Sequence, residues 1–371
     1  EHAIIWKLLK DNKDLEIYCA PGNGGISKIS KCVPILPTDI EGLLKFALDE
    51  KIDLTIVGME DPLVMGIVDE FQKNGLKIFG PSKEAATLEG SKAFSKKLMK
   101  QYNIPTAEYE VFENFDLAND YVLKANYPLV IKADGLALGK GVTICHNYDQ
   151  AKVALVELMK EKKFKDSGSK VVIEEFLTGT EVSVLAFCDG TNIVPMVSAK
   201  DHKPIFDDDK GPNTGGMGTI SPSRIYTNDI AKECMEKIFI PTVNAMKNEN
   251  KKFVGIIFFG LIITDDGPKV IEYNARFGDP ETQSVLPRLK SNLLDIFLSC
   301  IEGNLDKQII EWDSNATCCV ILASGGYPES YEKGFEIKGL ESKMEDNIIV
   351  FHSATILEND IFKTNGGRVL G

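Results

Sequence analysis

Hydrophobic positions over residues 1–90 follow two alternating patterns. Apolar residues spaced by three and four predict helices, which we place at 2–10, 40–50 and 64–74. Short apolar runs between them predict strands at 15–20, 54–57 and 77–79. Strands that alternate with helices of this length are typical of a parallel sheet covered by helices. Because the chain opens directly into a helix, we expect a first strand and its turn to be missing ahead of residue 1.

The pattern changes after one more helix, predicted over 91–101. Short strands then predominate, and we place them at 109–111, 129–132, 142–145, 171–175 and 182–187. A helix near 149–163 interrupts them, and a long amphipathic helix is predicted over 231–248. An apolar strand pair follows around the turn Asp265-Asp266-Gly267, at 254–263 and 268–275. The last part of the chain returns to short strands, predicted at 318–322, 348–352 and 354–358.

Composition narrows the class of protein. A chain of 371 residues suggests two or three domains at about 150 residues each. Its 42 Lys and Arg against 55 Asp and Glu give a net charge of −13, which argues against nucleic acid as the main partner. No apolar run approaches the roughly 18 residues that a membrane helix needs, since even the run 253–263 ends at Thr264-Asp265-Asp266. We therefore expect no nucleic-acid and no membrane partner.

Cysteine and histidine give no sign of a metal centre. The eight cysteines show no CxxC spacing, and the four histidines are dispersed along the chain. We expect each cysteine to be a small buried hydrophobic residue in a reducing cytosol rather than half of a disulfide. A zinc enzyme is therefore disfavoured.

A glycine-rich segment between two predicted strands, 132–142, is the first candidate for chemistry. It resembles a P-loop only superficially, because the spacing is one residue short and a strand rather than a helix follows. A glycine-rich hairpin can fold over a polyphosphate and offer its N–H groups without side-chain obstruction. Lys132 and Lys140 would supply point charges for phosphate oxygens. The alternative is a mobile surface hairpin without a ligand.

Acidic residues end the predicted strand 171–175. An apolar strand with such an end can hold an adenine, because its backbone groups can hydrogen-bond to the edge of the base. Glu181 could accept hydrogen bonds from the ribose hydroxyls. The alternative is a solvated strand end.

The strand around Glu272, Asn274 and Arg276 gives the sharpest signal. These three side chains share one face, because strand side chains alternate. A carboxylate and an amide oxygen suit Mg²⁺ that is held partly by nucleotide phosphates. Arg276 could neutralise a transferred phosphoryl group or bind a substrate phosphate. A solvent-facing strand with an incidental ion pair is the alternative, and the apolar opposite face weakens it.

Four glycines with Asn213 and Thr214 make the segment 211–218 a flexible loop that could approach a small polar substrate. By composition alone this loop could equally be a linker.

These segments, in this order, resemble the ATP-grasp enzymes and, among them, the phosphoribosylamine–glycine ligase (glycinamide ribonucleotide synthetase) family. The matching stretches run nearly end to end: 20–23, 57–58, 62–64, 80–83, 88–92, 132–142, 174–177, 201–203, 211–218, 271–283, 323–328 and 364–370. The strings 211–218 and 276–283 are highly specific. The chain departs from the family pattern at Pro204, where a basic residue is usual, and around Glu60.

The resemblance implies an α/β, multidomain ATP-grasp fold. A parallel-sheet N-terminal domain would occupy 1–91, and an ATP-grasp region with a mobile lid at about 107–177 would occupy 92–285. A small β-rich C-terminal domain, cut short at its end, would occupy 316–371. The implied protein is a cytoplasmic monomer that uses ATP with Mg²⁺ or Mn²⁺.

The implied reaction joins glycine to 5-phosphoribosylamine through glycyl phosphate, giving glycinamide ribonucleotide, ADP and phosphate for purine biosynthesis. By matching position, Lys92 and Lys132 would contact the ATP phosphates, together with Lys140 of the hairpin. The adenosine pocket would be lined by Glu174, Glu175, Phe176, Leu177 and Glu181, and the metal would be held by Glu272 and Asn274. Arg276 and Lys132 would be catalytic.

The resemblance also implies a set of residues that face the substrates: Gly22, Asn23, Asp201, Asn213, Thr214, Gly215, Gly216, Met217, Arg276, Asp279, Pro280 and Glu281. Asn213 would face the nucleotide as well. Two rival interpretations are another ATP-grasp ligase, such as a carboxylase subunit, and a nucleotide-binding protein without ligase activity. Another ATP-grasp ligase would lack the combination of the segments 211–218 and 276–283. A nucleotide-binding protein without ligase activity would not need all four of Lys132, Glu272, Asn274 and Arg276.

Overall fold

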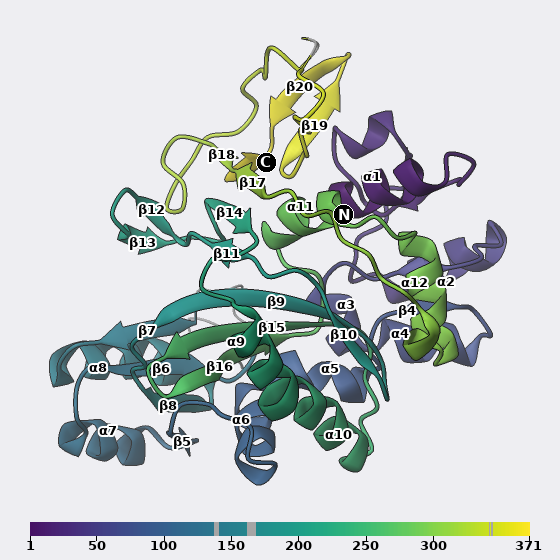
Figure 1. The fold of residues 1–371 in the computed structure, drawn as a ribbon. Helices are drawn as coiled ribbons and strands as arrows, with labels where there is room; N and C mark the ends of the chain where they lie inside the picture. Colours follow the sequence, from purple (N-terminus) through teal and green to yellow (C-terminus); the bar gives the residue numbers. More distant parts are fainter. Residues whose placement is uncertain (137–140, 162–167, 341, 343) are drawn as a thin grey trace.

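The computed structural model describes residues 1–136, 141–161, 168–340, 342 and 344–371 (Figure 1). Its N-terminal part alternates helices and strands: α1 (His2–Asp11), β1 (Tyr18–Cys19), β2 (Lys31–Cys32), α2 (Ile40–Asp49), β3 (Thr55–Ile56) and β4 (Ile78–Phe79). The strands pair in parallel, β1 with β2 and β3 with β4. This confirms the parallel arrangement that the sequence predicts, although each strand is only two residues long.

The single helix predicted over 64–74 is wrong. Gly66 has a φ of +99° and ends α3 (Glu60–Met65), and α4 (Ile67–Lys73) then begins in a new direction. Glycine adopts this left-handed conformation without steric cost, so it separates two helices within one apolar pattern. A further helix that the pattern did not predict, α5 (Lys83–Gly90), is capped by the hydroxyl of Ser82.

A four-stranded antiparallel sheet follows α6 (Lys92–Gln101), and its strand order is β5-β8-β6-β7. Its strands are β5 (Tyr109–Phe112), β6 (Leu129–Ala133), β7 (Val142–Cys145) and β8 (Val171–Glu175). One face packs against the unpredicted α7 (Phe115–Lys124) and against α8 (Tyr148–Leu155), which continues through a wider turn at Val156–Lys160. Because strand side chains alternate, the other face turns Val130 and Lys132 of β6 toward the rest of the molecule.

The central sheet has the order β10-β9-β15-β16 and is covered on both faces. Its strands are β9 (Thr180–Asp189), β10 (Ile193–Pro195), β15 (Val254–Thr264) and β16 (Gly267–Asn274). Val184 and Ala186 of β9 pack in one core with α9 (Asn228–Cys234) and α10 (Ile240–Asn248). Leu185 and Phe187 pack in a second core with α12 (Leu293–Glu302), on the opposite face (Figure 1). Burial on both faces explains the continuous apolar runs of these strands.

The long helix predicted over 231–248 is interrupted. It begins earlier, at Asn228, and passes through a wider turn at Met235–Phe239 before α10. Pro241 follows this turn and has no N–H for a helical hydrogen bond, which accounts for the local change of pitch.

Short strands build the remaining, mostly C-terminal, part: β11 (Lys200–Asp201), β12 (Pro204–Phe206), β13 (Lys210–Asn213), β14 (Gly218–Ser221), β17 (Thr317–Val320), β18 (Leu322–Ala323), β19 (Thr355–Glu358), β20 (Ile361–Thr364) and β21 (Arg368–Leu370). β14 lies between β11 and β17, so the C-terminal segment shares a sheet with the glycine-rich loop region. The predicted strand 348–352 is wrong, since only His352 forms a bridge, to Leu370. The helix α11 (Glu281–Val285) starts directly after the 276–280 turn.

All eight cysteines are free, but the expectation that each is buried is wrong for three of them. Cys32 and Cys318 are exposed and Cys19 is half-buried, because β1, β2 and β17 are short strands near the surface. In the part of the chain that the structure describes, no helix is long and apolar enough to cross a membrane.

Candidate active site

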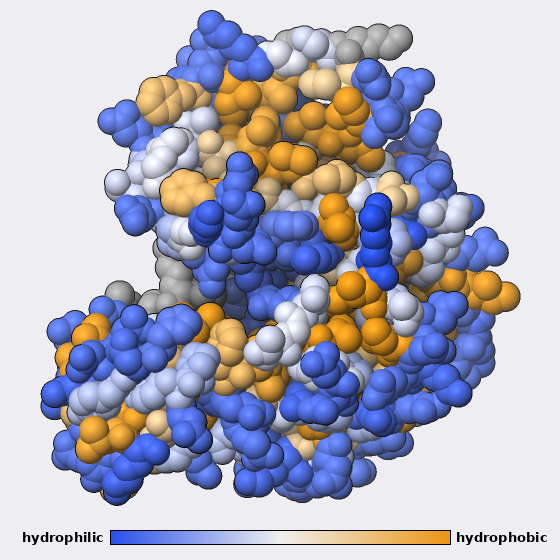
Figure 2. Space-filling view, turned by 60° about the vertical axis from the view of Figure 1, so that its left-hand side comes forward, coloured by the Kyte–Doolittle hydropathy of each residue, from blue (hydrophilic) through white to orange (hydrophobic). Residues whose placement is uncertain are grey.

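A cleft of about 1200 Å³ lies between the sheet β5-β8-β6-β7 and the central sheet. It extends to the loop after β13 and to the C-terminal segment around Phe351 and Arg368. Hydrophilic side chains surround a recess between the upper and lower parts of the molecule in the space-filling view (Figure 2). Charged side chains of both signs stand among apolar ones on its walls, so the cleft suits a ligand that carries charged groups as well as apolar parts.

Three charged side chains meet at the inner end of the cleft. Lys132 Nζ lies 3.0 Å from Glu174 Oε2 and 3.1 Å from the carbonyl oxygen of Ile271, which joins the two sheets. Lys96 Nζ lies 3.0 Å from the same oxygen of Glu174. All three charged residues are buried, with exposed fractions of 1–5%. The cluster therefore carries two positive charges and one negative charge beside the cleft.

The N-terminus of α6 is fixed by Asp134, which follows β6. The backbone N–H of Ala93 donates to Asp134 Oδ1 at 2.6 Å, and the N–H of Lys92 donates to the Asp134 carbonyl at 3.0 Å. Ser91 Oγ caps the helix by accepting from the N–H of Phe94. An acidic side chain at a helix N-terminus is favoured by the helix dipole. This contact holds Lys92, which lines the cleft, next to the start of the glycine-rich hairpin.

The residues predicted to line an adenosine pocket lie at the cleft, but Glu175 and Glu181 are engaged in contacts within the protein. Glu175, Phe176 and Leu177 line the cleft at the end of β8, as does Glu181 on β9. Glu175 Oε1 accepts from the N–H of Glu108 at 3.1 Å, and Glu181 Oε2 lies 3.1 Å from Lys203 Nζ. The hairpin residue Lys140 lies outside the described residues.

Glu272 and Asn274 point from β16 into the cleft and fit a divalent cation. Burial alone would raise the pKa of Glu272, but the charges of Lys203, Lys92, Lys132 and Arg276 outweigh it and lower that pKa, so the carboxylate is ionised. Within the described ranges, no other side chain hydrogen-bonds to the Glu272 carboxylate or the Asn274 amide. No group of three or more His, Cys, Asp or Glu side chains converges in the described residues. Two oxygen ligands therefore suit a metal whose other ligands are phosphates and water.

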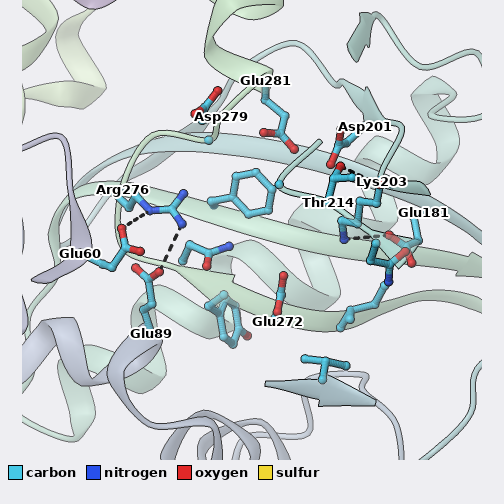
Figure 3. Close-up of a pocket in the computed structure, with 18 of the residues that line it drawn as sticks. Glu60, Glu89, Glu181, Asp201, Lys203, Thr214, Glu272, Arg276, Asp279 and Glu281 are labelled. Atoms are coloured by element: carbon cyan, nitrogen blue, oxygen red, sulfur yellow. Dashed lines mark hydrogen bonds and ion pairs between the residues drawn. The ribbon is translucent and has the colours of Figure 1, made fainter. Parts of the chain in front are cut away.

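Arg276 is held between two carboxylates (Figure 3). Its Nε donates to Glu60 Oε2 at 2.7 Å, and its Nη2 lies 3.7 Å from Glu89 Oε1. Although burial opposes the charge, Glu89 and Glu60 raise the pKa of Arg276, which stays protonated. Burial raises the pKa of Glu89 to about 7 despite the opposing charge of Arg276, while the Ala275 N–H donates to Glu89 Oε2 at 2.7 Å. Both acids thus aim the guanidinium into the cleft.

Asp201 on β11 and Glu281 on α11 form a second acidic pair that lines the cleft. Ser183 Oγ donates to Glu281 Oε1 at 3.0 Å, and the N–H of His202 donates to Asp201 Oδ1 at 2.7 Å. Burial, and then the nearby charge of Glu281, raise the pKa of Asp201 to about 7. Burial likewise raises the pKa of Glu281. Gly216 packs between Asp201 and Pro280, where a Cβ would come within 2.6 Å of Asp201 Oδ1.

The glycine-rich loop is held in place by the C-terminal segment. Arg368 Nη1 donates to the carbonyl of Gly215 at 2.7 Å, and Arg368 Nη2 lies 2.8 Å from Asp279 Oδ2. Tyr327 Oη accepts from the N–H of Gly215 at 3.0 Å. The loop 211–218 is therefore part of the cleft wall and not a linker.

Most residues that the sequence predicts for the site line this one cleft. Four others, Gly22, Gly216, Met217 and Pro280, are not among the lining residues, although Gly216 packs against Asp201. The amide of Asn23 lines the cleft but bonds within the protein, donating to the His352 carbonyl at 2.9 Å and accepting from the N–H of Ile26.

Sequence reasoning did not assign roles to several cleft residues: Glu89, Lys96, Lys203 and Arg368. One signal was available for Lys96, which follows Lys92 by four residues and so lies on the same face of α6. Arg368 stands in a string that matches the family, but nothing in the sequence shows that it reaches Asp279.

The chain is an ATP-grasp protein, because a model of an ATP-grasp (A) domain matches residues 90–282. Two antiparallel sheets face each other across the cleft. The structure resembles that of a biotin carboxylase–beta-gamma-ATP complex from Campylobacter jejuni, with a TM-score of 0.75 and 14% identity, covering 99% of this chain and 84% of that one. At this identity the likeness shows the fold alone. The chain belongs to the phosphoribosylglycinamide synthetase family, whose N domain matches residues 1–89, whose ATP-grasp (A) domain matches 90–282 and whose C domain matches 317–371.

Similar proteins agree with this family. The chain is 51% identical over 370 residues to a phosphoribosylamine–glycine ligase from Halalkalibacterium halodurans, covering 100% of this chain and 86% of the relative. It is 46% identical over 374 residues to the ligase from Escherichia coli O157:H7, covering 100% and 87%. The crystal structure of the Thermotoga maritima ligase matches with a TM-score of 0.85 and 32% identity, covering 100% and 88%.

Proposed function

We propose that this chain is an ATP-dependent ligase that joins glycine to 5-phosphoribosylamine and releases ADP and phosphate, as the names of its relatives indicate. The observation that carries the proposal is the convergence of Lys132, Glu272, Asn274 and Arg276 on one cleft. A nucleotide-binding protein without ligase activity would not need a guanidinium held by two carboxylates beside Glu272 and Asn274.

In the first half of the proposed reaction, the glycine carboxylate attacks the γ-phosphorus of ATP. A bond forms between a glycine oxygen and that phosphorus, the bond to the β–γ bridging oxygen breaks, and ADP leaves. Glu272 and Asn274 would hold Mg²⁺ or Mn²⁺, which would neutralise charge on the nucleotide phosphates. Arg276 would stabilise negative charge on the transferred phosphoryl group. The protein contributes positioning and charge rather than covalent chemistry.

The ammonium group of glycine needs an anionic partner, and Asp201 with Glu281 suits it. Other acidic residues of the wall are already paired with a cation: Glu60, Glu89, Glu174, Glu175, Glu181 and Asp279. Five lining carboxylates among the described residues have no ion-pair partner. Glu272 is the proposed metal ligand, and Glu1 and Asp209 are exposed, which leaves Asp201 and Glu281. Burial disfavours the ionised form of these two carboxyl groups, and an ammonium placed between them would favour it again.

In the second half, the amine of 5-phosphoribosylamine attacks the carbonyl carbon of glycyl phosphate. A carbon–nitrogen bond forms, the carbon–oxygen bond to phosphate breaks, inorganic phosphate leaves and a proton leaves the nitrogen. The acyl phosphate must be kept from water until the amine arrives. Closure of the glycine-rich hairpin would serve this purpose, but residues 137–140 lie outside the described ranges. A monomeric, cytoplasmic protein stays a prediction.

The test is ADP release with Mg-ATP when glycine and freshly made 5-phosphoribosylamine are added separately and together. Turnover that requires both substrates would support the ligase. ATP binding without turnover under every combination would contradict it. Hydroxylamine offered in place of 5-phosphoribosylamine would report the first half alone, because it captures glycyl phosphate as a hydroxamate.

A further inference from the structure

Lys96 is a buried cation for which the proposed reaction has no direct role. It lies on α6 with 1% of its surface exposed, and its Nζ has three oxygen partners. These are Glu174 Oε2 at 3.0 Å, Thr106 Oγ1 at 2.8 Å and the carbonyl of Ala107 at 3.2 Å. Burying an ammonium costs several kcal/mol unless its partners compensate, so such a residue calls for an explanation.

Lys96 shares its carboxylate oxygen with Lys132. Without Lys96, Lys132 and Glu174 would form a neutral one-to-one pair, and the attraction of Glu174 would offset the charge of Lys132. With Lys96 present, the three side chains carry a net charge of +1 in a buried part of the cleft wall. A net charge held at low dielectric favours an anion in the adjoining space.

We propose that Lys96 is a positioning residue that takes up the charge of Glu174 and so leaves the charge of Lys132 available to the polyphosphate of the bound nucleotide. Lys96 does not itself touch the nucleotide in this arrangement, because its three partners are protein oxygens. This inference rests on nucleotide binding in the proposed function, but not on ligase turnover.

The geometry separates this role from simple support of the fold. A residue that only fills the core would affect binding of every part of the nucleotide equally. A residue that sets the net charge of the cluster acts on the phosphates and leaves the nucleoside unaffected. Adenosine and ADP are therefore the two probes, since they share the base and the ribose and differ in phosphate charge.

The principal experiment measures binding of MgADP and of adenosine by calorimetry, with the full chain and its Lys96→Gln variant. We expect ADP affinity to fall roughly 10- to 100-fold, the order expected for loss of one unit charge near a phosphate in a partly buried site. Adenosine affinity should change less than about twofold. Lys97→Gln is the matched control, because Lys97 is the exposed neighbour on the same helix and its loss changes the total charge equally.

The pH dependence of ADP affinity is a second measurement, and a purely structural role of Lys96 would not affect it. Burial lowers the pKa of Lys96 to about 8, although the attraction of Glu174 raises it; the charge of Lys132 adds to the lowering. Glu175 and the ring of Tyr109, 5.6 Å from Nζ, also face it. ADP affinity of the unmodified chain should fall between pH 7 and 9 as Lys96 loses its proton. Lys96→Arg should bind ADP with a flatter profile, because a guanidinium stays charged.

Thr106→Val covers the case in which Lys96→Gln does not fold. Thr106 Oγ1 accepts from Lys96 and donates to the carbonyl of Val270, so valine keeps the shape of the side chain and removes one partner of Lys96. We expect weaker ADP binding with adenosine binding unchanged. Equal losses of adenosine and ADP affinity, or ADP affinity that Lys96→Gln leaves unchanged, would overturn the proposal. Either result can be obtained even if the chain shows no ligase turnover.

Discussion

Arg368 Nη2 lies 2.8 Å from Asp279 Oδ2, across a separation of 89 residues. The same guanidinium donates to the carbonyl of Gly215, so one side chain of β21 holds both the glycine-rich loop and the turn after β16. The C-terminal segment thus forms part of the cleft wall. Its contribution is a fixed loop geometry rather than a direct step of the chemistry.

Replacing Arg368 by alanine should therefore loosen substrate binding and spare the nucleotide. We expect kcat/KM for glycine to fall roughly 10- to 100-fold, the range for a lost hydrogen bond to a charged group. Binding of MgADP, measured by calorimetry, should change little. Arg224→Ala is the control, because Arg224 is exposed and does not line the cleft. If ADP and glycine were affected equally, Arg368 would be supporting the whole cleft instead.

Arg276→Lys should be more harmful than its conservative appearance suggests. Lysine cannot keep the bond to Glu60 and the contact with Glu89 while also pointing a fork of donors into the cleft. We expect kcat to fall roughly 100-fold or more, as for loss of one donor to a transition-state charge. The measurement is ADP release under saturating substrates. Unchanged kinetics would remove Arg276 from the reaction.

Sequence patterns predicted the elements of the fold better than the contacts between them. The strand 171–175 is placed correctly to the residue, because apolar residues end there at a run of acids. The helix over 64–74 failed because Gly66 changes the direction of the chain without interrupting the apolar pattern. Periodicity records which face is buried, but not where the backbone turns.

In the site, too, local patterns were predictable from the sequence and contacts between elements were not. The shared face of Glu272 and Asn274 follows from alternation along β16, which is local information, while Arg276 stands just beyond the end of that strand. The partners Lys96–Glu174 and Arg368–Asp279 come from different elements, so they depend on how sheets and loops pack. Glu174 was predicted to serve the adenosine pocket, and the structure adds that two lysines hold it.

Glu272→Ala should weaken metal binding directly. In this variant Asn274 is the remaining proposed protein ligand. The Mn²⁺ concentration for half-saturation should therefore rise at least ~10–100-fold, the loss of affinity typical of disturbed metal sites. Free Mn²⁺ measured by electron paramagnetic resonance, with ADP present, reports this without relying on activity. Asp266→Ala, on the turn before β16, is the control. Near-normal binding and activity at low Mg²⁺ would contradict the assignment.

Glycine binding should depend on pH through Asp201. Burial and Glu281 raise its pKa to about 7, so the carboxyl is neutral below that pH and cannot pair with an ammonium. Raising the pH from 6 to 8 increases the ionised fraction about tenfold, and KM for glycine should fall by a similar factor. The charges of Lys203 and Arg368 oppose the shift, and the pKa of Lys203 is itself raised, so Lys203 stays charged over this range.

Asp201→Asn should remove this dependence and leave KM for glycine high at every pH. KM for ATP, measured in parallel, should not follow the same profile. If the unmodified chain showed a flat glycine profile, or if Asp201→Asn kept the slope, the ammonium would have to bind elsewhere.

Phe297 couples the core of the molecule to the turn that carries the site. Its ring centroid lies 4.3 Å from that of Phe79 on β4, 6.5 Å from Phe187 on β9 and 6.1 Å from Phe277, beside Arg276. Because Phe297 is fully buried, Phe297→Ala should lower the free energy of unfolding by about 3–5 kcal/mol. Urea denaturation followed by circular dichroism measures this, with Phe335→Ala at an exposed position as control. A loss below about 1 kcal/mol would mean that the surrounding rings close the cavity, and Phe277 would then move with them and take Arg276 out of place.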